Sequence, residues 1–226
     1  MMDSQMRTGV ILIIFGLVLS TGLGYYFGTI TAPQKGVSTG VTTSVGSSVP
    51  NSPYVLTLVI TTGNTFNSSV GQQPAYYVLG PSGLESSASI SLPANRMIQV
   101  VIQNYDEGNA TPSLPEYYNV TGTVNGTMSV IDNNVVNSSQ GPSGIVITGT
   151  QTVSSLPPAE ISHTFTVPQL NLNIPVAAET TVIAYFMTGG PGTYVWFCTT
   201  PCGSGPDGTA GAMASPGWMN GNIVVS

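Results

Sequence analysis

The stretch that decides the fold runs Gly192-Thr-Tyr-Val-Trp-Phe-Cys198-Thr-Thr-Pro-Cys202-Gly-Ser-Gly205, and a second run follows at Met219-Asn-Gly-Asn-Ile-Val-Val225. Tyr194, Trp196 and Cys198 recur at every second position, as residues on one face of a β-strand do. These runs predict the last two strands of a sheet, Thr193–Cys198 and Asn222–Ser226. Residues 199–218 between them are far longer than an ordinary hairpin loop, and long ordered loops tend to be functional.

Further short runs lie upstream, rich in β-branched or aromatic residues and bounded by turn residues: Val55–Thr61, Ala75–Leu79, Met97–Gln103, Ile161–Val167 and Thr180–Met187. We find neither a helical pattern nor an internal repeat, so this organisation predicts an all-β sandwich or barrel. The Asn/Ser/Thr-rich segment 104–158 carries weak strand signals, and we expect a large, partly structured insertion there. Gly80-Pro-Ser-Gly83 is typical of a turn.

Charged side chains make up only 5% of the 226 residues, whereas 41% are apolar, which is enough for one sizeable core. Three Lys and Arg against nine Asp and Glu give a formal net charge of -6. Because there is no basic stretch, we do not expect binding to nucleic acid or to an anionic membrane surface. So few carboxylates also mean that acid changes the charge little, which suits the exterior of an acidophile.

The N-terminal segment is apolar and uncharged from Thr8 to about Thr31, long enough to cross a bilayer as one helix. Arg7 precedes it and aromatic residues lie near its far end. These features predict a single-pass protein of the cell membrane with a cytoplasmic N-terminus and an extracellular C-terminal domain. We expect an anchor at 1–31, a Ser/Thr/Gly-rich tether at 32–53 and a domain at 54–226. A cleaved signal peptide and a pilin-like helix are alternatives.

Five Asn-x-Ser/Thr motifs predict that the exported domain is a glycoprotein. Four of them lie in the 104–158 insertion, where sugars would supply the solubility that charge does not. The acceptor residues are Asn67, Asn109, Asn119, Asn125 and Asn137.

The scarce side chains that bind metals gather in the last third of the chain. His163 is the only histidine and lies on the apolar face of the alternating run Ile161–Val167. Alone, this pattern fits a hydrogen-bonded core histidine as well as a buried ligand. Cys198 and Cys202 fit a metal site or an extracellular disulfide. Imidazole, thiolate and thioether groups are ligands that copper prefers, which makes these three residues and Met219 the candidate metal site.

In their order, these segments resemble subunit II of the haem-copper oxygen reductases, the cupredoxin-like subunit that receives electrons at a dinuclear copper (CuA) centre. The likeness covers His163-Thr-Phe-Thr-Val167 through Phe186, then Gly192 to Gly205, then Met219 to Val225. It is closest to the B family, whose subunit II has a single N-terminal helix. The resemblance implies a cupredoxin-like Greek-key β-sandwich with one N-terminal transmembrane helix. It also implies certain partners, namely haem-copper oxidase subunit I, other membrane subunits, and a small redox protein or a quinol as electron donor.

Carried over residue by residue, the resemblance implies that His163 is the first imidazole ligand and Met219 the thioether ligand. Cys198 and Cys202 would be bridging thiolates. Thr200 stands where the family uses a main-chain carbonyl, so its side chain is expected to matter little. We expect a non-catalytic electron-transfer subunit, since no Gly-x-Ser-x-Gly elbow accompanies the histidine to suggest a hydrolase.

The chain departs from the family where the second histidine should stand, because that position is Pro206 and an apparent insertion follows. A two-imidazole centre cannot be built from one histidine. An altered copper site would use Met219 or Met213, with Asp207 or water in place of the lost imidazole. Alternatively, this is the copper-free subunit II of a quinol oxidase, in which the cysteines pair. A third interpretation is a membrane-tethered blue copper protein resembling sulfocyanin, although such sites normally use two histidines and one cysteine. A surface or adhesive protein is a further alternative.

Overall fold

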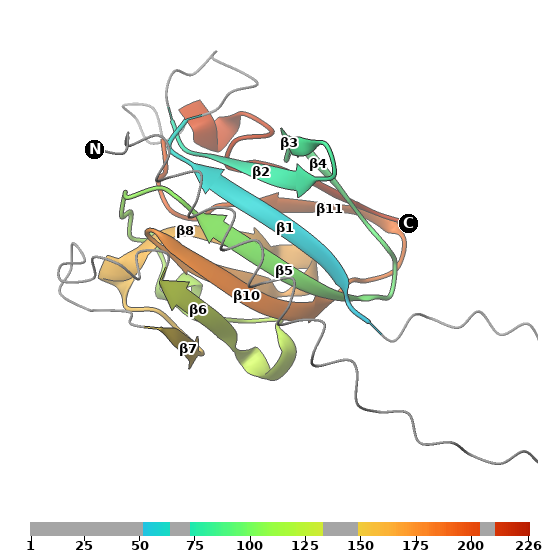
Figure 1. Cartoon of the computed structure of the whole chain (residues 1–226), viewed down its shortest axis with the longest axis horizontal. Coiled ribbons are helices and arrows are strands. Elements are labelled where there is room, and N and C mark those ends of the chain that lie inside the picture. Colours follow the sequence, from blue (N-terminus) through green and yellow to red (C-terminus); the bar gives the residue numbers. More distant parts are fainter. Residues whose placement is uncertain (1–51, 64–72, 133–148, 204–210) are drawn as a thin grey trace, which may run out of the picture. The chain divides into compact units, whose positions relative to one another are not determined.

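A computed structural model describes residues 52–63, 73–132, 149–203 and 211–226, and within these ranges the chain forms twelve β-strands and five short 3-10 helices (Figure 1). The strands are β1 (Tyr54–Thr61), β2 (Ala75–Gly80), β3 (Gly83–Ser86), β4 (Ser89–Leu92), β5 (Met97–Asn104), β6 (Met128–Asp132), β7 (Thr150–Val153), β8 (Ile161–Val167), β9 (Leu172–Ala177), β10 (Thr180–Met187), β11 (Gly192–Phe197) and β12 (Asn220–Val225). The 3-10 helices are η1 (Pro115–Tyr118), η2 (Val124–Gly126), η3 (Pro158–Glu160), η4 (Pro168–Leu170) and η5 (Gly211–Ala214).

The strands pair in two sheets. The larger sheet has the order β3-β2-β1-β5-β10-β6-β7, and the smaller has the order β4-β12-β11-β8-β9. β1 runs parallel to β5 and β12 runs parallel to β4, whereas the other strand pairs are antiparallel. In Figure 1, β1, β5 and β10 lie in front of β8 and β11, so the sheets stack face to face. The predicted all-β sandwich is confirmed.

The core lies between the two sheets, because the central strands of the larger sheet bury one face. Burial alternates along β5 and β10, and their pairing sets Ile102 opposite Val182 and Ile98 opposite Phe186 on the inner face. Trp196 of the smaller sheet is fully buried and belongs to the same hydrophobic core. The apolar residues at every second position, from which these strands are predicted, therefore mark the face that packs against the other sheet.

The segment 104–158 contributes more to the sheet than its weak signals predict. β6 pairs with β10, and β7 pairs with β6, so both strands extend the edge of the larger sheet. In β6 only Met128 and Val130 are buried, and a strand with so few apolar residues gives a weak pattern. The prediction also lacks β3, β4 and β9. β9 contains Pro175, which an edge strand tolerates, and β9 is the last strand of its sheet. The predicted turn is confirmed, since Gly80 pairs with Gly83.

Strand β8 differs from the alternating pattern of its sequence, because all seven of its residues are buried. Its register against β9 shifts between Ile161 and His163, which marks a β-bulge at Ser162. A bulge inserts one unpaired residue and re-aims the side chains beside it, often next to a functional site. The bulge therefore changes the direction of β8 where the candidate histidine stands.

The anchor predicted at 1–31 and residues 32–51 of the tether lie outside the described residues. Among the residues that the structure describes, no helix is long and apolar enough to cross a membrane. Three of the predicted glycosylation acceptors are exposed, and Asn67 and Asn137 lie outside the described residues. The exposed acceptors are Asn109, Asn119 and Asn125.

Candidate metal centre

The pairing of β8 with β11 brings the candidate ligands together. Phe197, the last residue of β11, lies opposite Thr166 of β8. Cys198 follows at once, and its Sγ accepts a hydrogen bond from the main-chain N–H of Thr164 at 3.3 Å. The N–H of Thr199 donates to the Thr164 hydroxyl at 2.8 Å. The first residues of the long loop after β11 are therefore held against the strand that carries the histidine.

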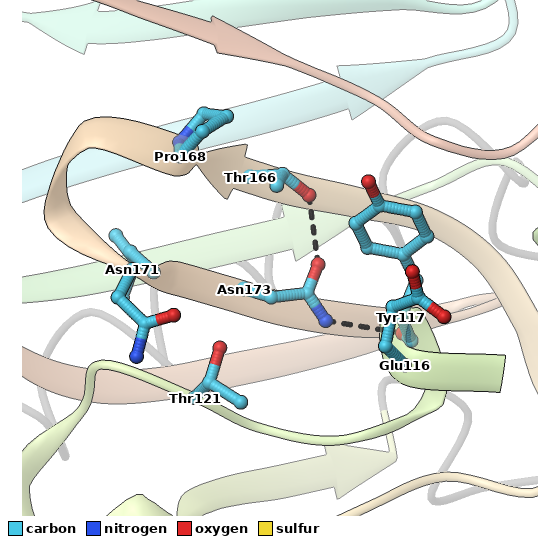
Figure 2. Close-up of a pocket in the computed structure, with 8 residues that line it drawn as sticks. Glu116, Tyr117, Thr121, Thr166, Pro168, Asn171 and Asn173 are labelled. Carbon is cyan, nitrogen blue, oxygen red and sulfur yellow. Dashed lines mark hydrogen bonds between the residues drawn. The ribbon is translucent and has the colours of Figure 1, made fainter. Parts of the chain in front are cut away.

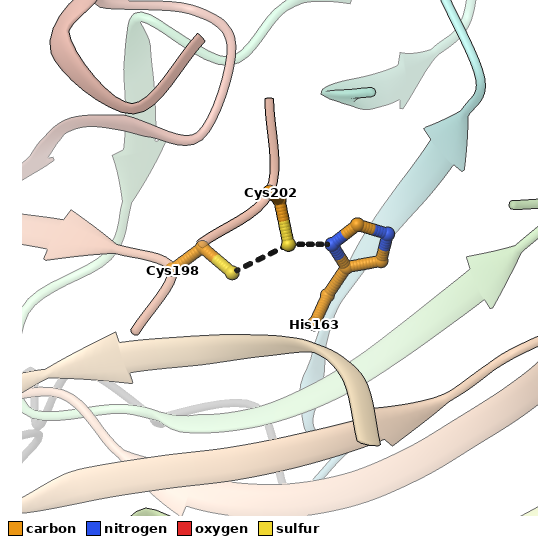
Figure 3. Close-up of side chains that lie close together, drawn as sticks. All are labelled: His163, Cys198 and Cys202. Atoms are coloured by element: carbon orange, nitrogen blue, oxygen red, sulfur yellow. Dashed lines mark hydrogen bonds between the residues drawn. The ribbon is translucent and has the colours of Figure 1, made fainter. Parts of the chain in front are cut away.

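Three of the four predicted ligands converge in one buried cluster, formed by His163, Cys198 and Cys202 (Figure 3). His163 Nδ1 lies 2.8 Å from Cys202 Sγ, and the two Sγ atoms lie 3.7 Å apart. One ligand atom from each residue lies within 4.8 Å of the others. His163 and Cys198 are 1% exposed and Cys202 is 5% exposed. Both cysteines are free thiols, so the cluster offers one nitrogen and two sulfur ligands away from water.

Thr200 lies between the two cysteines and binds to both sides of the cluster. Its hydroxyl donates to the carbonyl of Ser162 at 3.0 Å, lies 3.0 Å from Cys198 Sγ and contacts Cys202 Sγ. The Cys202 thiol donates to the same Ser162 carbonyl at 3.1 Å. The bulge leaves this carbonyl outside the strand ladder, where it accepts both bonds. The expectation that the Thr200 side chain matters little is therefore wrong.

Burial and mutual contact shift the acid–base behaviour of the cluster. Burial lowers the pKa of His163, but its interactions with Asp106 and with Cys198 outweigh this effect, so the pKa is raised. Burial also disfavours the Cys198 thiolate, but hydrogen bonds with Cys202 and His163 outweigh it and hold the pKa of Cys198 well below its ordinary value. Burial and the neighbouring Cys198 raise the pKa of Cys202. The two thiols therefore hold one negative charge readily and a second with difficulty.

The fourth predicted ligand, Met219, is fully buried next to the cluster. Its carbonyl accepts a hydrogen bond from the N–H of Cys198 at 2.8 Å, and its N–H donates to Ala212 at 3.3 Å. The main chain of Met219 is thus fixed beside the first cysteine. Met213, the alternative thioether, is half-buried and packs against the core. Asp207 and Pro206 lie outside the described residues.

Asp106 is a site residue that the sequence does not predict. One of its carboxylate oxygens, Oδ2, lies 3.0 Å from His163 Nε2, on the opposite side of the imidazole from the sulfur pair. The Asp106 side chain is 12% exposed, so the contact is nearly buried. The signal that could have pointed to Asp106 is its rarity, since it is one of only nine acidic residues and lies two residues after a strand.

A chain of hydroxyl groups runs from Thr199, next to Cys198, to a surface pocket of about 250 Å³. Figure 2 shows the pocket. The pocket is lined by Glu116, Tyr117, Thr121, Thr166, Pro168, Asn171, Leu172 and Asn173. Thr166 donates to Asn173 Oδ1 at 2.7 Å and lies 3.1 Å from the Thr164 hydroxyl, which in turn lies 2.9 Å from that of Thr199. Asn173 donates to two main-chain carbonyls, that of Tyr117 in η1 and that of Asn119 directly after η1. This network fixes β8 and β9 beneath the cysteine loop.

The ligand chemistry of the cluster fits copper, because thiolates and imidazole are the soft and borderline ligands that copper selects. The Ser162 hydroxyl is fully buried and has no hydrogen-bond partner among the described residues, so the bulge leaves one polar group unsatisfied beside His163. The cluster does not fit a centre with two imidazoles, because the whole chain contains one histidine. What it offers is a sulfur-rich site with a single nitrogen ligand.

Among solved structures, the chain is similar to auracyanin B, with 16% identity, coverage of 79% of this chain and 93% of that one, and a TM-score of 0.34. It is also similar to reduced auracyanin from Roseiflexus castenholzii, with 13% identity, coverage of 77% of this chain and 98% of that one, and a TM-score of 0.31. The corresponding values for rusticyanin from Thiobacillus ferrooxidans are 14% identity, coverage of 76% of each chain and a TM-score of 0.30. No protein-family description and no curated protein matches the chain. Identities and TM-scores this low carry no information on function, which has to be inferred from the residues of this chain.

Proposed function

We propose that this protein is an electron-transfer subunit that binds copper through His163, Cys198 and Cys202, with Met219 as a fourth ligand. The observation that carries the proposal is the convergence of one imidazole nitrogen and two thiol sulfurs within 4.8 Å in a buried cluster. The three residues come from β8 and the loop after β11, which the sandwich holds together. Copper bound there would supply one-electron redox chemistry.

The protein itself supplies a rigid and dry environment for such an ion. The Thr164 N–H and the Thr200 hydroxyl hold Cys198 Sγ, and the Thr200 and Ser162 contacts hold Cys202 Sγ. Ligands positioned before the metal binds need little rearrangement when its charge changes, and this lowers the barrier to electron transfer. Burial of the cluster keeps water from completing the ligand set.

In the cell, the proposed role is that of subunit II of a haem-copper oxygen reductase, with an altered CuA-like site. The support is the order of ligands in the sequence, in which His163 precedes the Cys198 and Cys202 pair and Met219 directly precedes the last strand. The chain would deliver electrons from a small redox protein or a quinol to a haem-containing subunit I. The apolar segment before residue 32 would anchor it in the cell membrane, with the sandwich outside.

The test of the copper site is reconstitution of the full-length chain in mild detergent with copper, under reducing conditions followed by oxidation. We expect strong sulfur-to-copper charge-transfer absorption, lost in Cys198→Ser and in Cys202→Ser. Zinc loading is the control, because zinc binds the same ligand types without redox chemistry and gives no such band. A folded protein with two reactive thiols that takes up no copper under either condition would exclude the proposal.

A copper-free subunit II is a second candidate, favoured by the short distance between the two Sγ atoms, 3.7 Å. Oxidation would then join the thiols, and the domain would only support the oxidase structurally. In that case the isolated protein should be colourless and contain no reactive thiol.

Isolation from native membranes distinguishes an oxidase subunit from a tethered blue copper carrier. A subunit should be purified together with haem-containing chains, whereas a carrier should be purified alone.

A further inference from the structure

The imidazole of His163 lies between two partners of different chemistry. Nδ1 faces Cys202 Sγ at 2.8 Å, and Nε2 faces Asp106 Oδ2 at 3.0 Å. We propose that Asp106 is the positioning residue of this centre, which keeps a hydrogen on Nε2 and turns Nδ1 towards the two sulfurs. This inference rests on the proposed copper site, for which the ring must present the lone pair of Nδ1.

The direction of the hydrogen bond follows from the chemistry of the groups. An ionised carboxylate only accepts hydrogen bonds, so the Nε2 atom beside Asp106 has to carry the hydrogen. In the neutral ring, the lone pair then lies on Nδ1, the nitrogen that faces Cys198 and Cys202. Ligand histidines in metal sites commonly donate their other N–H to a carboxylate, which fixes the tautomer and the ring orientation. Asp106 cannot share an ion with Nδ1, because it lies on the opposite side of the ring.

The main chain of Asp106 is held without help from its carboxylate. Its N–H donates to the Asn104 side chain at 3.0 Å, and its carbonyl accepts from the N–H of Glu179 at 3.2 Å. Asn104 is itself buried and donates to the Ala177 carbonyl at 2.9 Å. This connection between the end of β5 and the start of β10 should therefore keep its conformation when the carboxylate is removed. The Asp106 carboxylate is therefore available to accept a hydrogen bond from His163 Nε2.

Without Asp106, the Nε2–H group of a 1% exposed ring would lose its hydrogen-bond acceptor. Tyr76 meets the ring at 6.2 Å between centroids, nearly edge-on at 73°, and such an aromatic contact limits tilting without choosing between the two nitrogens. We therefore expect the ring to populate both tautomers and to turn about its own axis. Both changes reduce the time for which Nδ1 is directed at the sulfurs.

The test compares Asp106→Ala and Asp106→Asn with Glu107→Gln in the full-length chain. Glu107 is the adjacent, exposed carboxylate, so Glu107→Gln removes the same charge without a contact to the ring. The first measurement uses the copper-free, reduced protein at a pH above the raised pKa of His163, where the ring is neutral and its nitrogen chemical shifts report the tautomer. We expect one Nε2–H tautomer with a slowly exchanging proton in the wild type and in Glu107→Gln. We expect a mixture of tautomers in Asp106→Ala and retention of the wild-type tautomer in Asp106→Asn, whose amide oxygen still accepts.

The second measurement is copper(I) affinity by competition with a coloured chelator. Loss of a carboxylate that orients a ligand histidine typically weakens metal binding about 10- to 100-fold. We expect that loss in Asp106→Ala, a smaller loss in Asp106→Asn and none in Glu107→Gln. A wild-type tautomer together with wild-type affinity in Asp106→Ala would overturn the inference. If no variant binds copper but the tautomers change as expected, the proposed function fails while the positioning role of Asp106 stands. If Asp106→Ala does not fold, the copper(I) affinity of Asp106→Asn decides, because wild-type affinity in that folded variant would contradict the inference.

Discussion

Replacing Thr200 by valine isolates the role of its hydroxyl, because the two side chains have nearly the same volume and Thr200 is fully buried. The hydroxyl donates to the Ser162 carbonyl at 3.0 Å and lies 3.0 Å from Cys198 Sγ. Valine leaves that carbonyl with the weaker thiol donor of Cys202 at 3.1 Å. A buried hydrogen bond contributes about 1 kcal/mol, and a fully unsatisfied acceptor costs about 1–3 kcal/mol. Because the thiol still donates, we expect the free energy of unfolding to fall by about 1–2 kcal/mol.

Urea unfolding of the reduced full-length chain, followed by tryptophan fluorescence, measures this loss as a lower midpoint with an unchanged slope. A second measurement follows thiolate absorbance against pH. A hydroxyl has one hydrogen, which Thr200 gives to the Ser162 carbonyl while Cys198 is a thiol and turns towards Cys198 Sγ when that thiol ionises. This contact lowers the pKa of Cys198, so valine should move the titration midpoint to higher pH. Thr200→Ser keeps the hydroxyl and is the control for the midpoint. If Thr200→Val unfolds and titrates like the wild type, the assignment of Thr200 as the support of the sulfur pair is refuted.

Three further predictions concern other parts of the domain. Met219→Leu nearly conserves volume and should cost less than about 1.5 kcal/mol while changing the copper absorption spectrum. Met213→Leu is its control, and a spectrum altered only by that control would move the thioether role to Met213. Asn173→Ala removes an amide that bonds to Thr166 and to two main-chain carbonyls. It should lower the free energy of unfolding by about 2–4 kcal/mol, and unchanged thermal unfolding would contradict this. Burial raises the pKa of Glu160, so the folded state disfavours the ionised carboxylate. The resulting loss of stability is absent at a pH below the pKa of the unfolded chain and is complete at a pH above the pKa of the folded chain. Glu160→Gln should therefore be more stable than the wild type at pH 7 and equally stable near pH 3.5. A difference that does not depend on pH would refute that cause.

The sequence by itself was sufficient for the all-β class and for the main strands, because burial of one face repeats every two residues in β5, β10 and β12. It was also sufficient to select the cluster residues, since a chain with one histidine and two cysteines leaves little choice. Strands whose burial does not alternate clearly were missed, because the prediction depends on that alternation. β6 buries few residues, and β9 is buried on both faces and contains a proline, so neither alternates clearly.

The tertiary structure alone decided how the site is built. Asp106 lies 57 residues from His163 in the sequence, and Ser162 lies 38 residues from Thr200, yet both pairs are in hydrogen-bond contact. Local periodicity carries no information on such pairs, because the contacts arise where β5, β8 and the loop after β11 meet. The bulge at Ser162 likewise results from the register between β8 and β9. Strand periodicity is a property of neighbouring residues, whereas the orientation of a ligand ring depends on which distant groups the packed sheets bring to its two nitrogens.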